Sequence, residues 1–139
     1  MVQLIVGEKG KGKTKHLLDK VNSEIKSISG NIVYLDKSTK HMYELNNKVR
    51  LIDVSQYLIE NNDEFLGFIS GILSQDHDLQ QMYFDSFLKI AKLEDKDITP
   101  AIKKLERISE LFKVDFILSV SVNESMLPEE VKSKVIISL

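Results

Sequence analysis

The chain contains no cysteine, and this single absence removes several kinds of structure and chemistry. Disulfide bonds are excluded, and so are zinc sites built from cysteine thiolates. The absence also fits a protein kept in a reducing compartment, so we expect a cytoplasmic location.

Long apolar runs are missing as well. Residues 1–6 are apolar, but lysines follow at once and the run is too short for a signal peptide. No window approaches the roughly 18 apolar residues of a transmembrane helix, so we expect no membrane contact. The sequence contains no repeat, low-complexity tract or linker, and 139 residues fit one domain spanning 1–139.

A strongly basic balance is the third thing the chain lacks. Its net charge of −2 argues against a protein that binds nucleic acid through bulk charge. The charges are nevertheless uneven. Residues 1–52 contain ten Lys or Arg against five Asp or Glu, whereas residues 53–97 contain three against ten. The basic part of the chain coincides with a glycine-rich stretch.

Short apolar runs alternate with segments of helical periodicity. Such alternation predicts an α/β fold, here a three-layer sandwich with a mostly parallel sheet of five to six strands. Strands are expected at 3–6, 31–36, 49–54, 80–85, 115–122 and 135–139. Helices are expected from Thr14 to a stop at Gly30, over 55–74 with a break and new cap at Asn61–Asn62, from a Thr99 cap onward, and from Pro128.

Two segments fit more than one structure. Residues 86–98 fit either a short helix or an ordered loop. The connection 37–48 is short for a helical crossover, so the strand at 49–54 is either an edge strand or a hairpin partner.

The glycine-rich stretch GEKGKGKT occupies residues 7–14 and matches the pattern G-x-x-x-x-G-K-[ST]. A strand is expected before it and a helix after it, which is the context that a phosphate-binding loop requires. Glycines let successive backbone N–H groups converge on an anion, and the positive end of the helix adds to the same point. A lysine-rich hairpin turn is the plainer alternative.

This motif assigns expected roles. Lys13 would reach the β- and γ-phosphates of a nucleotide, and the Thr14 hydroxyl would hold Mg²⁺. The expected nucleotide-binding residues are Gly7, Glu8, Lys9, Gly10, Lys11, Gly12, Lys13, Thr14 and Lys15.

A bound Mg²⁺ needs a second acid, and Asp85 is the first candidate because it ends the apolar run MYFD. We expect Thr14 and Asp85 to share the ion, and Lys13 and Asp85 to act in catalysis. Asp36 and Asp53 also end apolar strands and remain alternatives, and a cap on the next segment is the plainer alternative for Asp85 itself.

Other polar residues carry weaker signals. Ser119 and Ser121, late in the fifth expected strand, are either sensors of the γ-phosphate or ordinary small strand residues. The three histidines, His16, His41 and His77, have no metal-ligand spacing and are expected at the surface.

The motif and its setting resemble the P-loop NTPases of the RecA-like class, in which another strand separates the P-loop strand from the strand that ends in the acid. The resemblance implies the P-loop NTPase fold with ATP and Mg²⁺ as ligands. The order of elements is also similar to that of bacterial thymidine kinases, but those have Glu after the Asp and a cysteine zinc site. This chain has Ser86 there and no cysteine.

The whole chain also resembles short bacterial proteins labelled after the twitching-motility retraction ATPase. The chain is too short for that hexameric motor and lacks its acidic and histidine boxes. The interpretation that follows is an ATP-binding protein that hydrolyses slowly or under the control of a partner.

Two other functions remain open: a kinase for a small acceptor with Asp36 as base, and a nucleotide-sensing interaction module. The only arginines are Arg50 and Arg107, so no arginine-rich lid is expected. If an activating arginine exists, a second copy of the chain or another protein must supply it.

Overall fold

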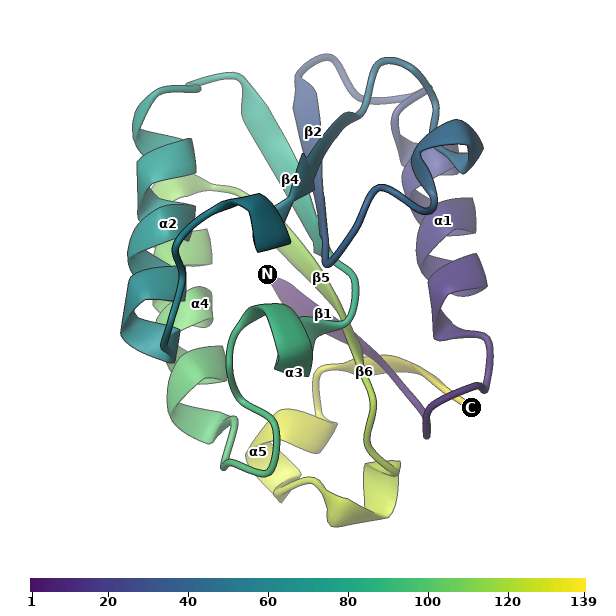
Figure 1. Ribbon diagram of the computed structural model, residues 1–139, viewed down its shortest axis with the longest axis vertical. Helices are drawn as coiled ribbons and strands as arrows, with labels where there is room; N and C mark the ends of the chain where they lie inside the picture. Colours follow the sequence, from purple (N-terminus) through teal and green to yellow (C-terminus); the bar gives the residue numbers. More distant parts are fainter.

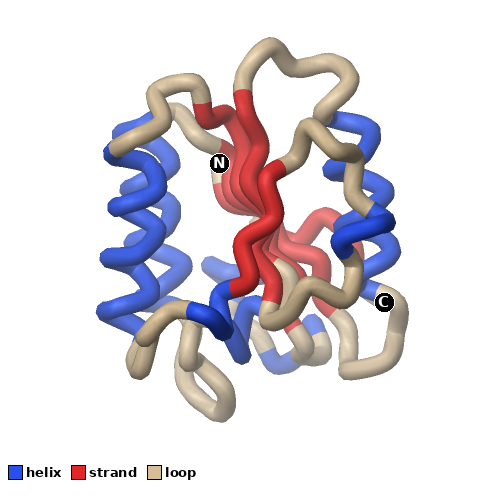
Figure 2. Tube along the Cα trace, turned by 45° about the horizontal axis from the view of Figure 1, so that its top comes forward, coloured by secondary structure: helices blue, strands red, loops and turns tan.

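The computed structural model describes all residues, 1–139, as one α/β unit. Its centre is a six-stranded sheet in the order β3-β2-β4-β5-β1-β6, and every neighbouring pair is parallel. Helices cover both faces, which Figure 2 shows with the strands between two groups of helices. The strands are β1 (Val2–Val6), β2 (Asn31–Asp36), β3 (Arg50–Asp53), β4 (Leu79–Phe84), β5 (Asp115–Val120) and β6 (Val135–Ser138).

The helices fall into two groups (Figure 1). Helix α1 lies alone on one face of the sheet, and α2 and α4 lie together on the other. The α-helices are α1 (Lys13–Glu24), α2 (Asn62–Ser74), α3 (Phe87–Ile90), α4 (Thr99–Phe112) and α5 (Glu129–Lys132). Three 3-10 turns complete the chain: η1 (Met42–Glu44), η2 (Val54–Gln56) and η3 (Glu124–Met126).

Strand side chains alternate between two cores, because successive residues of a strand point to opposite faces. In β2, Val33 and Leu35 join the larger core of 28 residues under α2 and α4, whereas Ile32 and Tyr34 join the smaller core of 10 under α1. The same alternation directs Asp36, the last residue of β2, and Asp85, the residue after β4, toward α1, because each follows by two a tyrosine of the smaller core. It therefore decides which polar side chains meet at the end of the sheet.

Most of the predicted elements are present, and the parallel three-layer arrangement is confirmed. The strand at 49–54 is an edge strand, because β3 pairs in parallel with β2 and forms no hairpin. The open segment 86–98 contains the short helix α3 followed by a loop. The strand expected over 115–122 ends at Val120.

Three helix predictions need correction. The first helix ends at Glu24 and continues only as turns, so its apolar spacing up to Ile28 overstated its length. Residues 57–61 are not helical, and α2 begins after Asn61, whose side chain accepts from Glu64 N as predicted for the new cap. Thr99 is not a cap: it lies inside α4, and its buried hydroxyl has no hydrogen-bond partner.

No helix combines the length and the apolar character needed to cross a membrane.

Candidate functional site

The loop between β1 and α1 has the backbone of an anion-binding turn. Gly10 and Gly12 adopt φ angles of 87° and 92°, in the left-handed region where a side chain is strained. Gly12 caps α1, and the first backbone N–H groups of any helix lack intrahelical acceptors. The N–H groups of Gly10 and Gly12 have no partner either, so the loop leaves several backbone donors free, as an anion-binding turn does.

Lys13 folds back over this loop. Its side chain is buried, and Nζ donates to the carbonyl oxygen of Glu8 at 3.1 Å. Burial lowers the pKa of Lys13, while the nearby charge of Asp85 opposes that shift. The ammonium is therefore held inside the turn by a single neutral acceptor, which an anionic ligand can replace.

Asp85 follows β4 directly, and its carboxylate accepts four hydrogen bonds. Its Oδ1 accepts from the Thr14 hydroxyl at 3.1 Å, the Ser119 hydroxyl at 3.3 Å and the Ser86 N–H at 2.9 Å. Its Oδ2 accepts from the Tyr34 hydroxyl at 2.8 Å. The 3.1 Å contact means that the motif threonine and the predicted acid are adjacent, as sequence reasoning expected. Ser119 lies beside them, but as a donor to Asp85.

Tyr34 was not predicted, although the sequence carries a signal for it. It precedes Asp36 by two positions and so points to the same face of the sheet as Asp36 and α1. Burial and the charge of Asp85 raise the pKa of the Tyr34 hydroxyl, which therefore stays protonated and donates.

Asp36, at the end of the neighbouring strand, has an incomplete set of partners. Its Oδ1 accepts from the Lys37 N–H at 2.7 Å, but its Oδ2 is buried without any donor. Burial and then the charge of Asp85 raise the pKa of Asp36 to about 6. A carboxyl group with such a pKa can exchange a proton near neutral pH, as a general base must.

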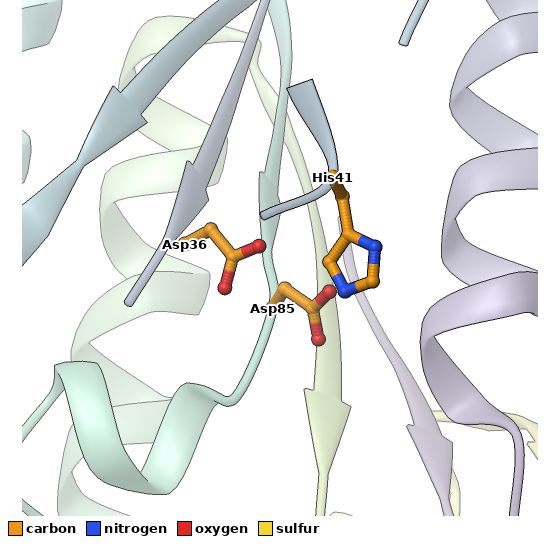
Figure 3. A group of neighbouring side chains, drawn as sticks. All are labelled: Asp36, His41 and Asp85. Carbon is orange, nitrogen blue, oxygen red and sulfur yellow. The ribbon is translucent and has the colours of Figure 1, made fainter. Parts of the chain in front are cut away.

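His77 is exposed as predicted, whereas His41 is only partly so, with 24% of its side chain exposed. The 37–48 connection folds back over the carboxyl ends of the strands and brings His41 to Asp36 and Asp85, where the donor atoms of the three residues lie within 4.8 Å of one another (Figure 3). Its Nδ1 lies 2.7 Å from Glu44 Oε2. No spacing rule indicates this meeting, because it depends on the path of a loop.

The remaining candidates are scattered. Asp53 Oδ1 accepts hydrogen bonds from the N–H and the hydroxyl of Ser55, so Asp53 does not replace Asp85 beside Thr14. Lys15 pairs with Asp19 on the exposed side of α1. Arg50 begins β3, at the opposite end of the sheet, and Arg107 lies in the middle of α4.

A cavity of about 290 Å³ lies beside the ends of β2, β4 and β5. Its walls carry three lysines, and none of them forms an ion pair within the chain. Its polar lining residues are Lys9, Lys37, Ser86, Lys89, Glu94, Asp95 and Ser121. In open parallel sheets, ligands bind outside the carboxyl ends of the strands, which is where this cavity lies.

Comparisons with known proteins add no name to this geometry: no protein-family model matches the chain, and no curated protein matches it significantly.

Proposed function

We propose that the chain is a P-loop NTPase of the RecA-like class that binds ATP with Mg²⁺. The observation that carries the proposal is the 3.1 Å contact between Thr14 Oγ1 and Asp85 Oδ1. It joins the last residue of a G-x-x-x-x-G-K-[ST] loop to an acid at the end of a buried parallel strand. Those are the two protein groups that hold the metal ion in P-loop NTPases.

The strand order supports the RecA-like class. β5 lies between β1, which leads into the loop, and β4, which leads to Asp85. A separating strand of this kind is the feature on which the resemblance rests.

The residues present fit a magnesium triphosphate. The free N–H groups of the loop and the first turn of α1 would contact the phosphates, and Lys13 would neutralise their charge. The Thr14 hydroxyl and the Asp85 carboxylate are hard oxygen ligands of the kind that Mg²⁺ prefers, with Asp85 bound through water. We propose adenine as the base of the nucleotide, because the chain contains no N/TKxD sequence of the kind that recognises guanine.

Isothermal titration calorimetry with Mg-ATP tests the binding step. Because a charge-assisted phosphate contact contributes about 1.5–3 kcal/mol, Lys13→Ala should weaken binding by about tenfold or more. Lys26→Ala removes an exposed lysine beyond the end of α1 and should leave the affinity unchanged. Equal affinities for the wild type and Lys13→Ala would refute the proposal.

Hydrolysis by the isolated chain should be slow, on the order of one turnover per minute or less. A water-orienting residue and an arginine finger contribute about 10³–10⁵ in rate in related enzymes. Here Ser86 follows Asp85, and neither Arg50 nor Arg107 lies at the carboxyl end of the sheet. An activating arginine would come from a second copy or another protein.

Steady-state phosphate release measures this rate, with Lys13→Ala as the control for contaminating ATPases. Turnover of several per second that disappears in Lys13→Ala would mean that the chain carries a complete hydrolytic site.

A kinase for a small acceptor is the second candidate, and the cavity lined by Lys9, Lys37 and Lys89 is the observation that favours it. Lys37 follows Asp36, and Ser86 follows Asp85, so the cavity adjoins the proposed metal site. Asp36 would accept the proton of an acceptor hydroxyl. ATP consumption that rises only when an acceptor is added would favour the kinase, whereas binding without turnover in any condition would favour a nucleotide sensor.

A further inference from the structure

Asp36, His41 and Asp85 form a compact cluster from three separate segments. Asp36 ends β2, Asp85 follows β4, and His41 comes from the loop between β2 and η1. Each residue offers one atom that could bind a metal ion, and these three atoms lie within 4.8 Å of one another. Donor atoms on one ion with bonds of about 2.1 Å lie roughly 3–4 Å apart. Small side-chain rotations would therefore bring all three onto a single ion.

One carboxylate of the cluster has a buried oxygen without a partner. Asp36 is only 2% exposed, and its Oδ2 has no hydrogen-bond partner. Its carboxylate points toward that of Asp85, which is also only 2% exposed (Figure 3). No lysine or arginine forms an ion pair with either acid. Buried charges are ordinarily paired or bound to metal, and a cation between the two carboxylates would satisfy the oxygen that lacks a partner.

His41 is oriented as a metal-binding histidine is. The Glu44 carboxylate can only accept, so the Nδ1 that lies 2.7 Å from its Oε2 carries the proton and donates. In the neutral ring, Nε2 then keeps its lone pair, and Figure 3 shows that the other ring nitrogen faces Asp85. A carboxylate on the far nitrogen of a histidine ligand fixes both its tautomer and its direction.

An ion also has a way in. A cavity of about 420 Å³ has Thr14, His41 and Glu44 among its lining residues, so the histidine side of the cluster borders open space.

We infer that Asp36, His41 and Asp85 bind a divalent first-row transition ion, of the class of Mn²⁺ or Zn²⁺, in addition to the nucleotide's Mg²⁺. Two carboxylate oxygens and one imidazole nitrogen favour such an ion over Mg²⁺, because imidazole is a poor ligand for Mg²⁺. The site needs no nucleotide. It shares Asp85 with the proposed Mg²⁺ position, so the two ions would lie side by side.

Electron paramagnetic resonance of Mn²⁺ tests this inference on the full chain, stripped with EDTA and free of nucleotide. We expect one Mn²⁺ per chain and a nitrogen coupling in the spin-echo signal from the His41 ring. His41→Gln should remove the coupling and weaken Mn²⁺ binding at least tenfold, and Asp36→Asn should weaken it similarly. His77→Gln, at an exposed histidine, is the matched control and should change neither value.

Glu44→Gln separates a ligand from a bystander. It should keep one Mn²⁺ and the nitrogen coupling but weaken binding by roughly 10–100-fold, because Glu44 acts through His41. Circular dichroism melting confirms that each variant is folded.

Two results would overturn the inference: wild type that binds Mn²⁺ no more tightly than His41→Gln, or bound Mn²⁺ without nitrogen coupling. Lys13→Ala keeps this test apart from the proposed function, since it should lose ATP and retain Mn²⁺. A Mn²⁺ that lacks nitrogen coupling and is lost in Thr14→Val would occupy the nucleotide's metal position instead, which also contradicts the inference.

Discussion

The two ends of the sheet differ in how completely their polar groups are hydrogen-bonded. At the amino end, the N-terminal ammonium contacts the Ser109 hydroxyl and lies 3.2 Å from Asp115, and the Gly30 N–H donates to the side chain of Gln80 at 3.0 Å. At the carboxyl end, Asp36 Oδ2 is buried without a donor, and the loop N–H groups lack acceptors.

Left-handed backbone is more frequent at the carboxyl end but is not confined to it. Gly10, Gly12 and Ser86 follow carboxyl ends of strands beside the candidate site, whereas Lys113, with a φ of 58°, precedes β5 at the amino end. Strain and unpaired groups raise the free energy of the folded chain, and they persist where a ligand offsets them. The amino end therefore contributes stability, and the carboxyl end retains groups for binding.

Phe116→Ala is expected to give the largest change in the free energy of unfolding. Phe116 lies at the amino end of β5, is fully buried, and packs on Phe84 with ring centroids 5.6 Å apart. Removing the ring should lower the free energy of unfolding by about 3–5 kcal/mol. Urea denaturation measures it, with Leu111→Ala on the exposed side of α4 as a control that should stay within about 0.5 kcal/mol. A loss below that of the control would contradict the assignment of stability to this end.

Gly30→Ala should give the next largest effect. A Cβ at Gly30 would lie 2.2 Å from the backbone oxygen of Asp78, which also accepts from the Asn31 N–H. Relieving that overlap should cost about 1–3 kcal/mol of stability. Below the melting temperature, nucleotide affinity by calorimetry should stay at the wild-type value. A loss of affinity in the folded variant would mean that the two ends are coupled.

Asp36→Asn should act in the opposite direction. Measured in EDTA at pH 7.5, it should raise the free energy of unfolding by about 1 kcal/mol, because a buried carboxylate without a full set of donors is costly. The gain has a defined pH range. The pKa of Asp36 is raised from 3.8 to about 6, so its ionisation destabilises the fold progressively between these values.

The wild type should therefore lose stability relative to Asp36→Asn as the pH rises from about 4 to 6, and the difference should vanish near pH 3.5. Urea denaturation across this range checks the sign. A variant that is less stable than wild type at pH 7.5 would show that Asp36 has partners that stabilise its charged form.

Ser86→Gly should give the smallest effect. Ser86 has a φ of 53°, a conformation that glycine adopts without the steric cost of a Cβ. Glycine's greater loss of backbone freedom offsets part of the gain, which leaves roughly 0.5 kcal/mol. The N–H that donates to Asp85 is retained, so nucleotide affinity should not change. Thermal melting and calorimetry on the same sample measure both values, and destabilisation would contradict the assignment of strain.

These positions also show what sequence can reveal. The limits of β2 were predicted correctly because its apolar run is bounded by Gly30 and ends in a charged residue. The contact of Thr14 with Asp85 was expected because Thr14 is the last residue of the loop motif and Asp85 is the acid at the end of an apolar strand. Local signals of this kind do not depend on how distant segments pack.

The errors have the opposite origin. Thr99 has the residue type and the following proline of a helix start, but the chain enters α4 one residue earlier and leaves its hydroxyl unpaired. His41 reaches the site because the 37–48 connection folds over it. Tyr34 reaches it because it lies two residues before Asp36 in β2 and points to the same face of the sheet. The position of His41 depends on tertiary packing, which residue type and spacing do not reveal, whereas the face on which Tyr34 lies could have been inferred from its spacing to Asp36.

Hydrogen exchange with and without Mg-ATP tests the central claim most directly, because it compares both ends of the sheet in one sample. The claim is that the unpaired backbone donors of the loop bind phosphate. Mg-ATP should slow exchange at the N–H groups of residues 10–15 at least tenfold, leave residues 29–31 and 115–116 unchanged, and have no effect in Lys13→Ala. Unchanged exchange at 10–15 under saturating Mg-ATP, or equal slowing at both ends, would contradict the account.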